Sequence, residues 1–236
     1  MKIYYVRHGQ SMNNTINDLS DQEYEKLRQQ DPQLSEQGIK QVRLLTDYLK
    51  QKKIDFEEIR CSPQQRAIQT AQLINECYKV PVKIQQNLHE KGGNQLLNQG
   101  FPGLTRKEFQ IKYPEVIIDE IITDAGWYFK DKRETDEECK LRAEKVIQDL
   151  QNEPQKSILI IGHGNFMDMV MGTVCGRAQN SKYFYYHQNC GITLLKNDGY
   201  GFEIDYYNDY SFLEMHYFKT GEDLILKRLA NYKGKI

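Results

Sequence analysis

Two apolar runs, each ending in a histidine followed by a glycine, constrain the fold of this chain most strongly. The β-branched and aromatic residues of these runs favour strands, and the second, unbroken run is typical of a strand that a parallel sheet buries on both faces. Both histidines are therefore expected at carboxyl ends of strands, where open α/β sheets bind ligands. The runs are residues 3–6, followed by Arg7-His8-Gly9, and residues 158–161, followed by Gly162-His163-Gly164.

The chain between these runs shows an alternation of helix and strand signals. Apolar residues recur at helical spacing over residues 36–49, with Ser35 as the expected N-cap. Ser62 followed by Pro63 predicts a helix start, with the serine as the cap and the proline at the first helical position. The other expected elements are a helix over 135–150, a helix after His163, short strands within 56–61 and 80–84, and an edge hairpin formed by 190–195 and 200–206.

This alternation predicts an α/β fold with a doubly wound, mostly parallel sheet flanked by helices. The 236 residues are interpreted as a single domain. Residues 91–133 lose the periodicity except for a helical piece at 105–113, so we expect an inserted cap or substrate region there. Residues 214–236 are expected to form a helical C-terminal tail. The aromatic group Trp127-Tyr128-Phe129 fits a substrate pocket and the packing of a lid about equally well.

Charge and cysteine content bear on the partners of the protein. The 32 basic and 33 acidic residues give a net charge of about −1, so nothing in the composition attracts nucleic acid or an anionic membrane. Five scattered cysteines, without CxxC spacing, argue against a disulfide framework and a zinc site. We expect a cytoplasmic protein without a bound metal or cofactor. The oligomeric state is not indicated by the sequence.

The loops at the carboxyl ends of the expected strands carry a set of residues suited to phosphate chemistry. Arg7 and Arg66 each offer a planar fork of donors for a dianion, and His8 and His163 would lie within their reach. A neutral imidazole can attack phosphorus and form a covalent intermediate. Glu90 is the carboxylic acid best placed to protonate the departing alkoxide. This scheme needs no metal ion.

Other residues of similar chemistry receive different interpretations. Glu76, or another acidic loop residue, is an alternative to Glu90 as the proton donor. His89 is expected at the surface, whereas His187 and His216 are expected to be structural.

Four ordered motifs resemble the histidine phosphatase superfamily, in its phosphoglycerate-mutase-like branch. The resemblance implies a phosphohistidine at His8, phosphoryl contacts from Arg7, Arg66 and His163, and Glu90 as the proton donor. It also suggests phosphate contacts from Ser11, Asn14 and the backbone around Gly164. The motifs are Arg7-His8-Gly9-Gln10-Ser11-Met12-Asn13-Asn14, Leu34-Ser35-Glu36-Gln37-Gly38, residues 62–71 from Ser62-Pro63 through Arg66-Ala67, and Gly162-His163-Gly164.

One departure from the family pattern decides between the activities that the resemblance allows. Phosphoglycerate mutases of this branch typically follow the acidic residue with an arginine and a Tyr-Gly pair, whereas Glu90 is followed by Lys91-Gly92-Gly93. The sequence therefore predicts a metal-independent phosphomonoester hydrolase acting on a small phosphorylated metabolite or a phosphoprotein. The alternatives are a cofactor-dependent phosphoglycerate mutase or a sugar bisphosphatase, and a catalytically weak module that binds a phospho-ligand or a protein.

Overall fold

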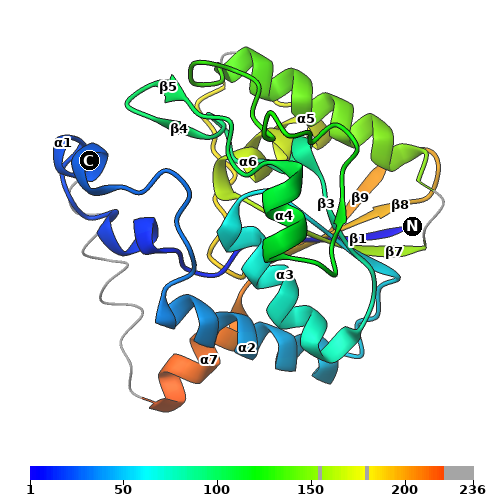
Figure 1. Cartoon of the computed structure of the whole chain (residues 1–236). Coiled ribbons are helices and arrows are strands. Elements are labelled where there is room, and N and C mark those ends of the chain that lie inside the picture. Colours follow the sequence, from blue (N-terminus) through cyan, green and yellow to red (C-terminus); the bar gives the residue numbers. More distant parts are fainter. Residues whose placement is uncertain (154–155, 179–180, 221–236) are drawn as a thin grey trace.

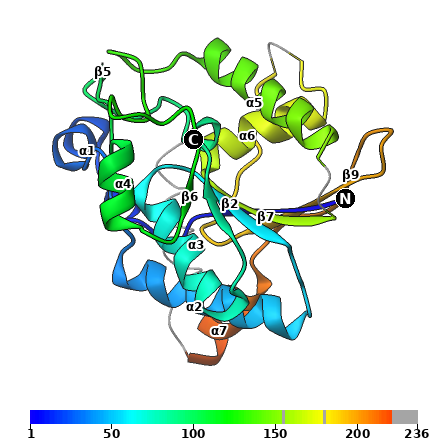
Figure 2. The same ribbon diagram turned by 45° about the vertical axis from the view of Figure 1, so that its right-hand side comes forward.

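A seven-stranded sheet with helices on both faces forms the centre of the protein (Figures 1 and 2). The computed structural model describes residues 1–153, 156–178 and 181–220. The sheet has the order β6-β3-β2-β7-β1-β8-β9. The first five strands run parallel to one another, β8 pairs antiparallel with β1, and β9 pairs antiparallel with β8. The predicted doubly wound, mostly parallel sheet is thus confirmed, and the predicted hairpin is β8 and β9 at one edge.

The strands of this sheet are β1 (Lys2–Arg7), β2 (Glu58–Cys61), β3 (Val82–Ile84), β6 (Ile117–Ile118), β7 (Ser157–Gly162), β8 (Ile192–Asn197) and β9 (Phe202–Asp209). A separate small hairpin pairs β4 (Gln95–Leu96) with β5 (Gln99–Gly100). The α-helices are α1 (Asp21–Leu27), α2 (Glu36–Gln51), α3 (Gln65–Tyr78), α4 (Arg106–Lys112), α5 (Asp136–Gln151), α6 (Gly164–Val174) and α7 (Ser211–Thr220), and short 3-10 helices are η1 (Met12–Ile16) and η2 (Gln86–Leu88).

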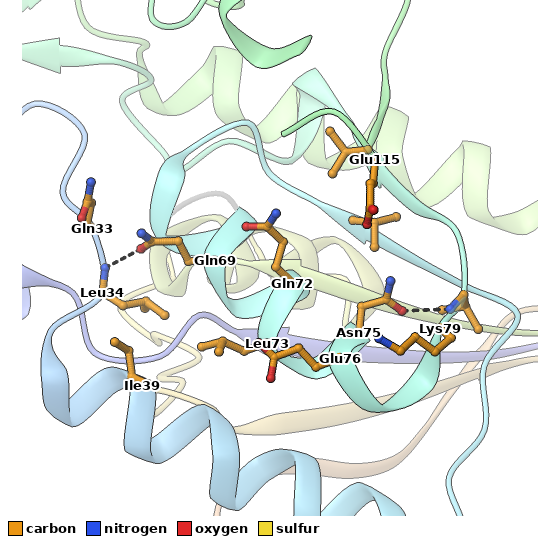
Figure 3. A pocket seen from close by; sticks show the side chains of 13 residues that line it. Gln33, Leu34, Ile39, Gln69, Gln72, Leu73, Asn75, Glu76, Lys79 and Glu115 are labelled. Atoms are coloured by element: carbon orange, nitrogen blue, oxygen red, sulfur yellow. Dashed lines mark hydrogen bonds between the residues drawn. The ribbon is translucent and has the colours of Figure 1, made fainter. Parts of the chain in front are cut away.

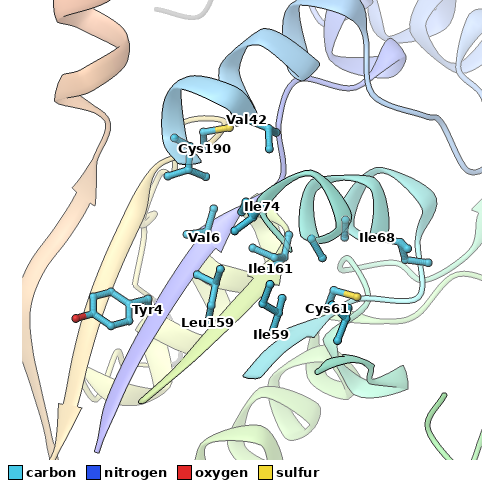
Figure 4. Packing of buried hydrophobic residues seen from close by; sticks show 14 of the residues in the cluster. Tyr4, Val6, Val42, Ile59, Cys61, Ile68, Ile74, Leu159, Ile161 and Cys190 are labelled. Carbon is cyan, nitrogen blue, oxygen red and sulfur yellow. The ribbon is translucent and has the colours of Figure 1, made fainter. Parts of the chain in front are cut away.

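Alternate side chains of the central strands fill two separate cores. Tyr4 and Val6 of β1 point to the face covered by α2 and α3, where they pack with the other residues drawn in Figure 4. Ile3 and Tyr5 point to the opposite face, which is covered by α5 and α6. Both faces are buried at the middle of β1 and β7, and this explains the uninterrupted runs at residues 3–6 and 158–161, with Lys2, Arg7 and Ser157 at the strand ends.

The helix α3 begins later than predicted and has another cap. Its N-cap is Gln64, whose side chain does not cap the helix, so the prediction of Ser62 as the cap and Pro63 as the first helical residue was wrong. The Ser62 hydroxyl instead lies 2.7 Å from Nε2 of His163. The carboxylate of Asp31, far away in the sequence, accepts the N–H of Gln65 at 3.0 Å and supplies the missing capping interaction.

The segment 91–133, where an inserted cap or substrate region is expected, contributes elements to the sheet and to the core. It contributes β6, which pairs with β3, and the helix α4. Its Trp127 and Tyr128 belong to the same core as buried residues of α3 and α4. Phe129 is exposed. The first two residues of the aromatic group therefore serve packing. The tail begins with α7, which starts at Ser211 rather than Glu214, and residues 221–236 of the predicted tail lie outside the described residues.

Two glycines allow the loop after β1 to lie against the first turn of α2. Neither Gly9 nor Gly38 has a positive φ, so neither glycine is required by a left-handed backbone conformation. A Cβ on Gly9 would come within 2.8 Å of the Gly38 carbonyl oxygen, and a Cβ on Gly38 within 2.0 Å of the Gln10 carbonyl oxygen. The Ser35 N–H donates to the same Gln10 oxygen at 2.9 Å, which fixes the two segments in contact. Close approach, not conformational freedom, requires these glycines.

We predict that Gly38→Ala lowers the free energy of unfolding by about 1–3 kcal/mol, because the added methyl group collides with backbone that is hydrogen-bonded in place. Helix propensity alone would stabilise this variant by about 1 kcal/mol, so the sign of the change is informative. Urea denaturation followed by circular dichroism measures it. Gly201→Ala is the matched control, since a Cβ there meets no atom within 4 Å. An unchanged or increased stability of Gly38→Ala would contradict the close contact.

Candidate active site

The parallel pairing of β1 with β7 brings the two histidines together. Arg7 of β1 lies opposite Gly162 of β7. The residues that follow these two strands, His8 and His163, therefore leave the sheet side by side. Their ring centroids are 5.0 Å apart. Both side chains are buried. The two histidines thus lie next to each other at the ends of neighbouring strands, as predicted from the sequence.

The hydrogen bonds of His8 define which ring nitrogen is free for chemistry. Its Nδ1 lies 2.6 Å from the carbonyl oxygen of Gly9, so Nδ1 carries the hydrogen and donates it. The lone pair is then on Nε2, which accepts the Nε–H of Arg66 at 3.1 Å. His8 therefore presents a basic nitrogen towards a guanidinium group, the arrangement that a phosphoryl acceptor needs.

Two further nitrogens in this region are buried without a protein partner. Arg7 donates from Nη1 to the carbonyl oxygen of His187 at 2.6 Å, but its Nε is buried and unpaired. His163 interacts through Nε2 with Ser62, whereas its Nδ1 is buried and unpaired. Such groups are rare because an unsatisfied buried donor costs about 1–3 kcal/mol. An oxyanion bound at this site would satisfy them.

Electrostatics keeps the site histidines neutral. Burial, followed by the charges of Arg66 and Arg7, holds the pKa of His8 well below its ordinary value of 6.5. Burial and Arg66 act in the same direction on the pKa of His163. Burial also lowers the pKa of Arg66, although the nearby charges of Asp31 and Glu90 oppose this shift. At neutral pH the site thus combines neutral imidazoles with guanidinium cations.

Glu90 follows the short helix η2 and reaches the amino end of α6. Its Oε1 accepts the N–H groups of Phe166 and Lys91, both at 2.8 Å. Its Oε2 has only a long contact of 3.4 Å from the Asn165 N–H. The backbone N–H of Glu90 donates to the side chain of Gln64 at 2.8 Å, next to the start of α3. The carboxyl group is therefore held between the loops that carry His163 and Arg66.

Ser11, Asn14 and Gly164 lie around the same loops. Asn14 accepts the backbone N–H of Ser11 at 3.1 Å, and Gly164 begins α6 so close to Arg7 that a Cβ would lie 3.3 Å from the Arg7 Nε. Sequence reasoning missed Asn189, whose side-chain amide donates to the carbonyl oxygen of His8 at 3.0 Å and contacts Asn14 at 3.3 Å. Nothing near Asn189 in the sequence indicated this position, because 180 residues separate it from His8.

The remaining histidines have structural surroundings. His89 is buried, with its ring 5.5 Å from that of Trp127 and its Nε2 4.0 Å from Glu134, so the expectation of a surface histidine was wrong. His187 is buried against Thr193, which fits its predicted structural role, and burial lowers its pKa to about 3. His216 lies on α7 beside Tyr217.

An open cavity of about 730 Å³ lies away from these histidines, along the side of α3 (Figure 3). Its lining contains neither histidine nor arginine, and Gln69 there holds the backbone of Leu34 at 2.8 Å. Glu76 lines this cavity, ten residues and therefore about 15 Å along the helix from Arg66. The structure therefore does not bring Glu76 to His8, whereas Glu90 and Asp31 both lie near Arg66, with Asp31 3.8 Å from its Nη1.

Searches for metal clusters and membrane spans cover only the described residues. In that part of the chain, three or more His, Cys, Asp or Glu residues nowhere gather in a way that could hold a metal ion. No helix within residues 1–153, 156–178 and 181–220 is long and apolar enough to cross a membrane.

Known proteins are similar to this chain in sequence or in fold. A curated relative, the 6-phosphofructo-2-kinase/fructose-2,6-bisphosphatase of Caenorhabditis elegans, is 29% identical over 166 residues, which cover 68% of this chain and 31% of the relative. The chain thus spans about a third of the length of that protein. The α-ribazole phosphatase of Shigella flexneri has a similar structure, with a TM-score of 0.63 and 17% identity over 89% of this chain and 96% of that one. A mycobacterial glucosyl-3-phosphoglycerate phosphatase, solved with VO3, gives a TM-score of 0.59 and 18% identity over 88% of this chain and 98% of that one.

The sequence profile of one family matches nearly the whole described chain. The match covers residues 3–210 and therefore includes both histidine loops, the α3 start and Glu90. It agrees with the resemblance found in the four motifs and supports an enzyme that acts on phosphate esters. The chain belongs to branch 1 of the histidine phosphatase superfamily.

Proposed function

We propose that this protein is a metal-independent phosphomonoester hydrolase that works through a phosphohistidine at His8. In the first step, Nε2 of His8 attacks phosphorus, the ester P–O bond breaks, and the departing alkoxide takes a proton from Glu90. In the second step, water attacks the phosphohistidine and gives its proton to the Glu90 carboxylate. Inorganic phosphate leaves, and both side chains return to their starting states.

A single observation carries this proposal. Nε2 of His8, the ring nitrogen without a hydrogen, faces Arg66 in a buried region where two other nitrogens have no hydrogen-bond partner. The 3.1 Å contact between His8 Nε2 and Arg66 Nε supports a phosphoryl position between these two groups. The unpaired Arg7 Nε and His163 Nδ1 supply further donors for its oxygens. Preorganised donors of this kind stabilise the negative charge of the transition state more than that of the free ester in water.

Glu90 fits the role of proton donor because its two oxygens have different surroundings. Oε1 is held by two short backbone hydrogen bonds, which fix the direction of the carboxyl group. Oε2 has only the long contact from Asn165 and is the oxygen that would carry the transferred proton. Ser11, Asn14, Asn189 and the first turn of α6 at Gly164 would support the phosphate from the other side.

A sugar bisphosphatase is the second candidate function. The observation in its favour is the 29% identity to the bisphosphatase-containing relative from Caenorhabditis elegans. A phosphoglycerate mutase is less favoured, because Lys91-Gly92-Gly93 follows Glu90 and Lys91 is paired with Asp136 at 2.9 Å. Turnover of fructose 2,6-bisphosphate, phosphoserine and an aryl phosphate, compared as kcat/KM, distinguishes the candidates. The substrate is a small phosphorylated metabolite or a phosphoprotein whose phosphoryl group can reach the recessed His8.

We predict that His8→Ala lowers kcat/KM for p-nitrophenyl phosphate by at least about 10³-fold, because the nucleophile is removed. The wild-type protein should keep its activity in excess chelator and should carry a covalent phosphoryl group after rapid quenching. Phosphate release and labelling of the protein measure both effects, and circular dichroism verifies the fold of the variant. A chelator-sensitive activity, or one that survives in His8→Ala, would refute the mechanism. Phosphate binding without any turnover would favour the binding-module alternative.

We predict that the loss in Glu90→Gln depends on the leaving group. The variant should lose about 10²-fold or more in kcat/KM with an alkyl phosphate, whose alkoxide needs a proton, and much less with p-nitrophenyl phosphate, whose phenolate leaves without one. The comparison uses kcat/KM because this ratio excludes the hydrolysis of the phosphohistidine, which is common to both substrates. The glutamine keeps the shape of the side chain and an oxygen that can accept the Phe166 N–H. Equal losses with both substrates would mean that Glu90 does not act as the acid.

We predict that His8 stays neutral at pH values where an ordinary histidine is half charged. Its pKa is held well below 6.5, so the imidazolium form is absent at pH 6.5 and the nucleophile remains available. NMR of ¹³C-labelled histidine follows the His8 signal, identified by its loss in His8→Gln. The same protein unfolded in urea provides the reference, with titration near pH 6.5. A folded-state midpoint at or above 6.5 would disprove the stated electrostatics.

A further inference from the structure

We propose that the ion pair between Glu134 and Arg142 is a positioning unit that holds the catalytic acid Glu90 in place. This inference rests on the proposed function, since it concerns the acid of that reaction. Glu134 lies just before α5 and Arg142 lies in the second turn of this helix, which packs beside α6 on one face of the sheet (Figures 1 and 2). Neither residue is part of the family motifs that indicated the site.

The pair has the geometry of a fork meeting a carboxylate. Arg142 donates from Nε to one oxygen of Glu134 at 2.8 Å and from Nη2 to the other at 2.7 Å. The side chain of Glu134 is 3% exposed and that of Arg142 is 11% exposed. A bidentate pair that is shielded from water in this way has a fixed orientation, unlike an exposed ion pair.

The pair binds the backbone of the Glu90 loop on both sides of the acid. On one side, Nη1 of Arg142 donates to the carbonyl oxygens of Asn87 at 2.8 Å and His89 at 2.9 Å. On the other side, Glu134 accepts the N–H of Gly92 at 3.2 Å, and the Glu134 N–H donates to the Gly92 carbonyl oxygen, also at 3.2 Å. Glu90 therefore lies between two anchored points of the chain and cannot move without breaking these bonds.

Arg142 also supports the group that holds the acid from the opposite side. Its guanidinium carbon lies 4.0 Å from the ring centroid of Phe166. The backbone N–H of the same Phe166 donates to Oε1 of Glu90 at 2.8 Å. One side chain thus links the Glu90 loop and the first turn of α6, and it sets the distance between them.

An apolar residue or a lysine cannot take over these contacts. Buried carbonyl oxygens need donors, and one guanidinium supplies the Asn87 and His89 oxygens while also saturating Glu134. A lysine has one ammonium group and cannot reach the two carbonyls and both carboxylate oxygens in one plane. Replacing Arg142 by lysine therefore preserves the charge but loosens the loop, and a shift of about 1 Å at a catalytic group can cost about 10²-fold in rate.

The test compares Arg142→Lys and Glu134→Gln with wild type and Glu90→Gln on an alkyl phosphate and on p-nitrophenyl phosphate. If the pair positions the acid, both variants should lose about tenfold to a hundredfold in kcat/KM with the alkyl phosphate and less than about threefold with the aryl phosphate. The ratio kcat/KM is used because it covers the steps up to the phosphohistidine, whose hydrolysis is common to both substrates. Adding Arg142→Lys to Glu90→Gln should then cause little further loss, because the acid that it positions is already absent.

Lys145→Ala provides the matched control on the same helix, since Lys145 forms an exposed ion pair with Asp149 at 2.7 Å. This variant should match wild type with both substrates. Thermal unfolding of every variant identifies a merely structural effect, and Glu134→Gln, which changes charge but not shape, is the milder of the two changes.

Losses in Arg142→Lys and Glu134→Gln that are equal for the two substrates, or fully additive with Glu90→Gln, would overturn the positioning role. So would wild-type rates in both variants while Glu90→Gln shows its leaving-group dependence. A wild-type protein that hydrolyses neither substrate would instead contradict the proposed function, so the two failures have different signatures.

Discussion

The parallel register of β1 and β7 is the constraint on which the site depends. With Arg7 opposite Gly162, both strands end at the same level of the sheet, and the ring centroids of His8 and His163 lie 5.0 Å apart. This register is stable because one-residue slippage would turn the apolar side chains of each strand towards the wrong core. Two hydrophobic cores, one on each face of the sheet, therefore set the geometry of a polar site at its edge.

The site also shows why burial and charge must be considered together. Burial and the neighbouring guanidinium groups keep His8 and His163 neutral. Arg7 and His163 each have a buried nitrogen without a hydrogen-bond partner. Such a cluster is costly when empty and becomes favourable when an anion with several oxygens enters. Asp31 and Glu90 moderate the positive charge, but each of them is held by backbone N–H groups at the start of a helix, α3 and α6 respectively. The starts of α3 and α6 thus each fix one acidic side chain whose charge acts on Arg66.

The loop that carries Glu90 depends on parts of the chain that follow it. Arg142 of α5 and Glu134 just before that helix bind the loop. The Tyr128 hydroxyl lies 3.3 Å from the Gly92 carbonyl oxygen and donates to the Lys132 carbonyl oxygen at 2.7 Å. A Cβ on Gly93 would collide with the Tyr128 ring, so this packing requires Gly93, whereas Gly92 has a φ of +93° that favours glycine. The sequence Lys91-Gly92-Gly93, which separates this chain from the mutase pattern, is therefore part of how the loop is built.

The sequence by itself determined the α/β class, the two strand-end histidines, the helix start at Ser35 and the membership of Arg66 in the first turn of α3, because these follow from local periodicity and short motifs. Only the tertiary structure decided which residues meet across long separations. Asn189 at the His8 carbonyl, Asp31 as the partner of the α3 start, buried His89 and the Glu134–Arg142 pair all depend on contacts between distant segments. The capping role predicted for Ser62 was wrong for the same reason: its hydroxyl lies within hydrogen-bonding distance of His163, about a hundred residues later in the chain. A local sequence pattern indicates which interactions a residue can form, whereas the packing of distant elements determines which partner it has.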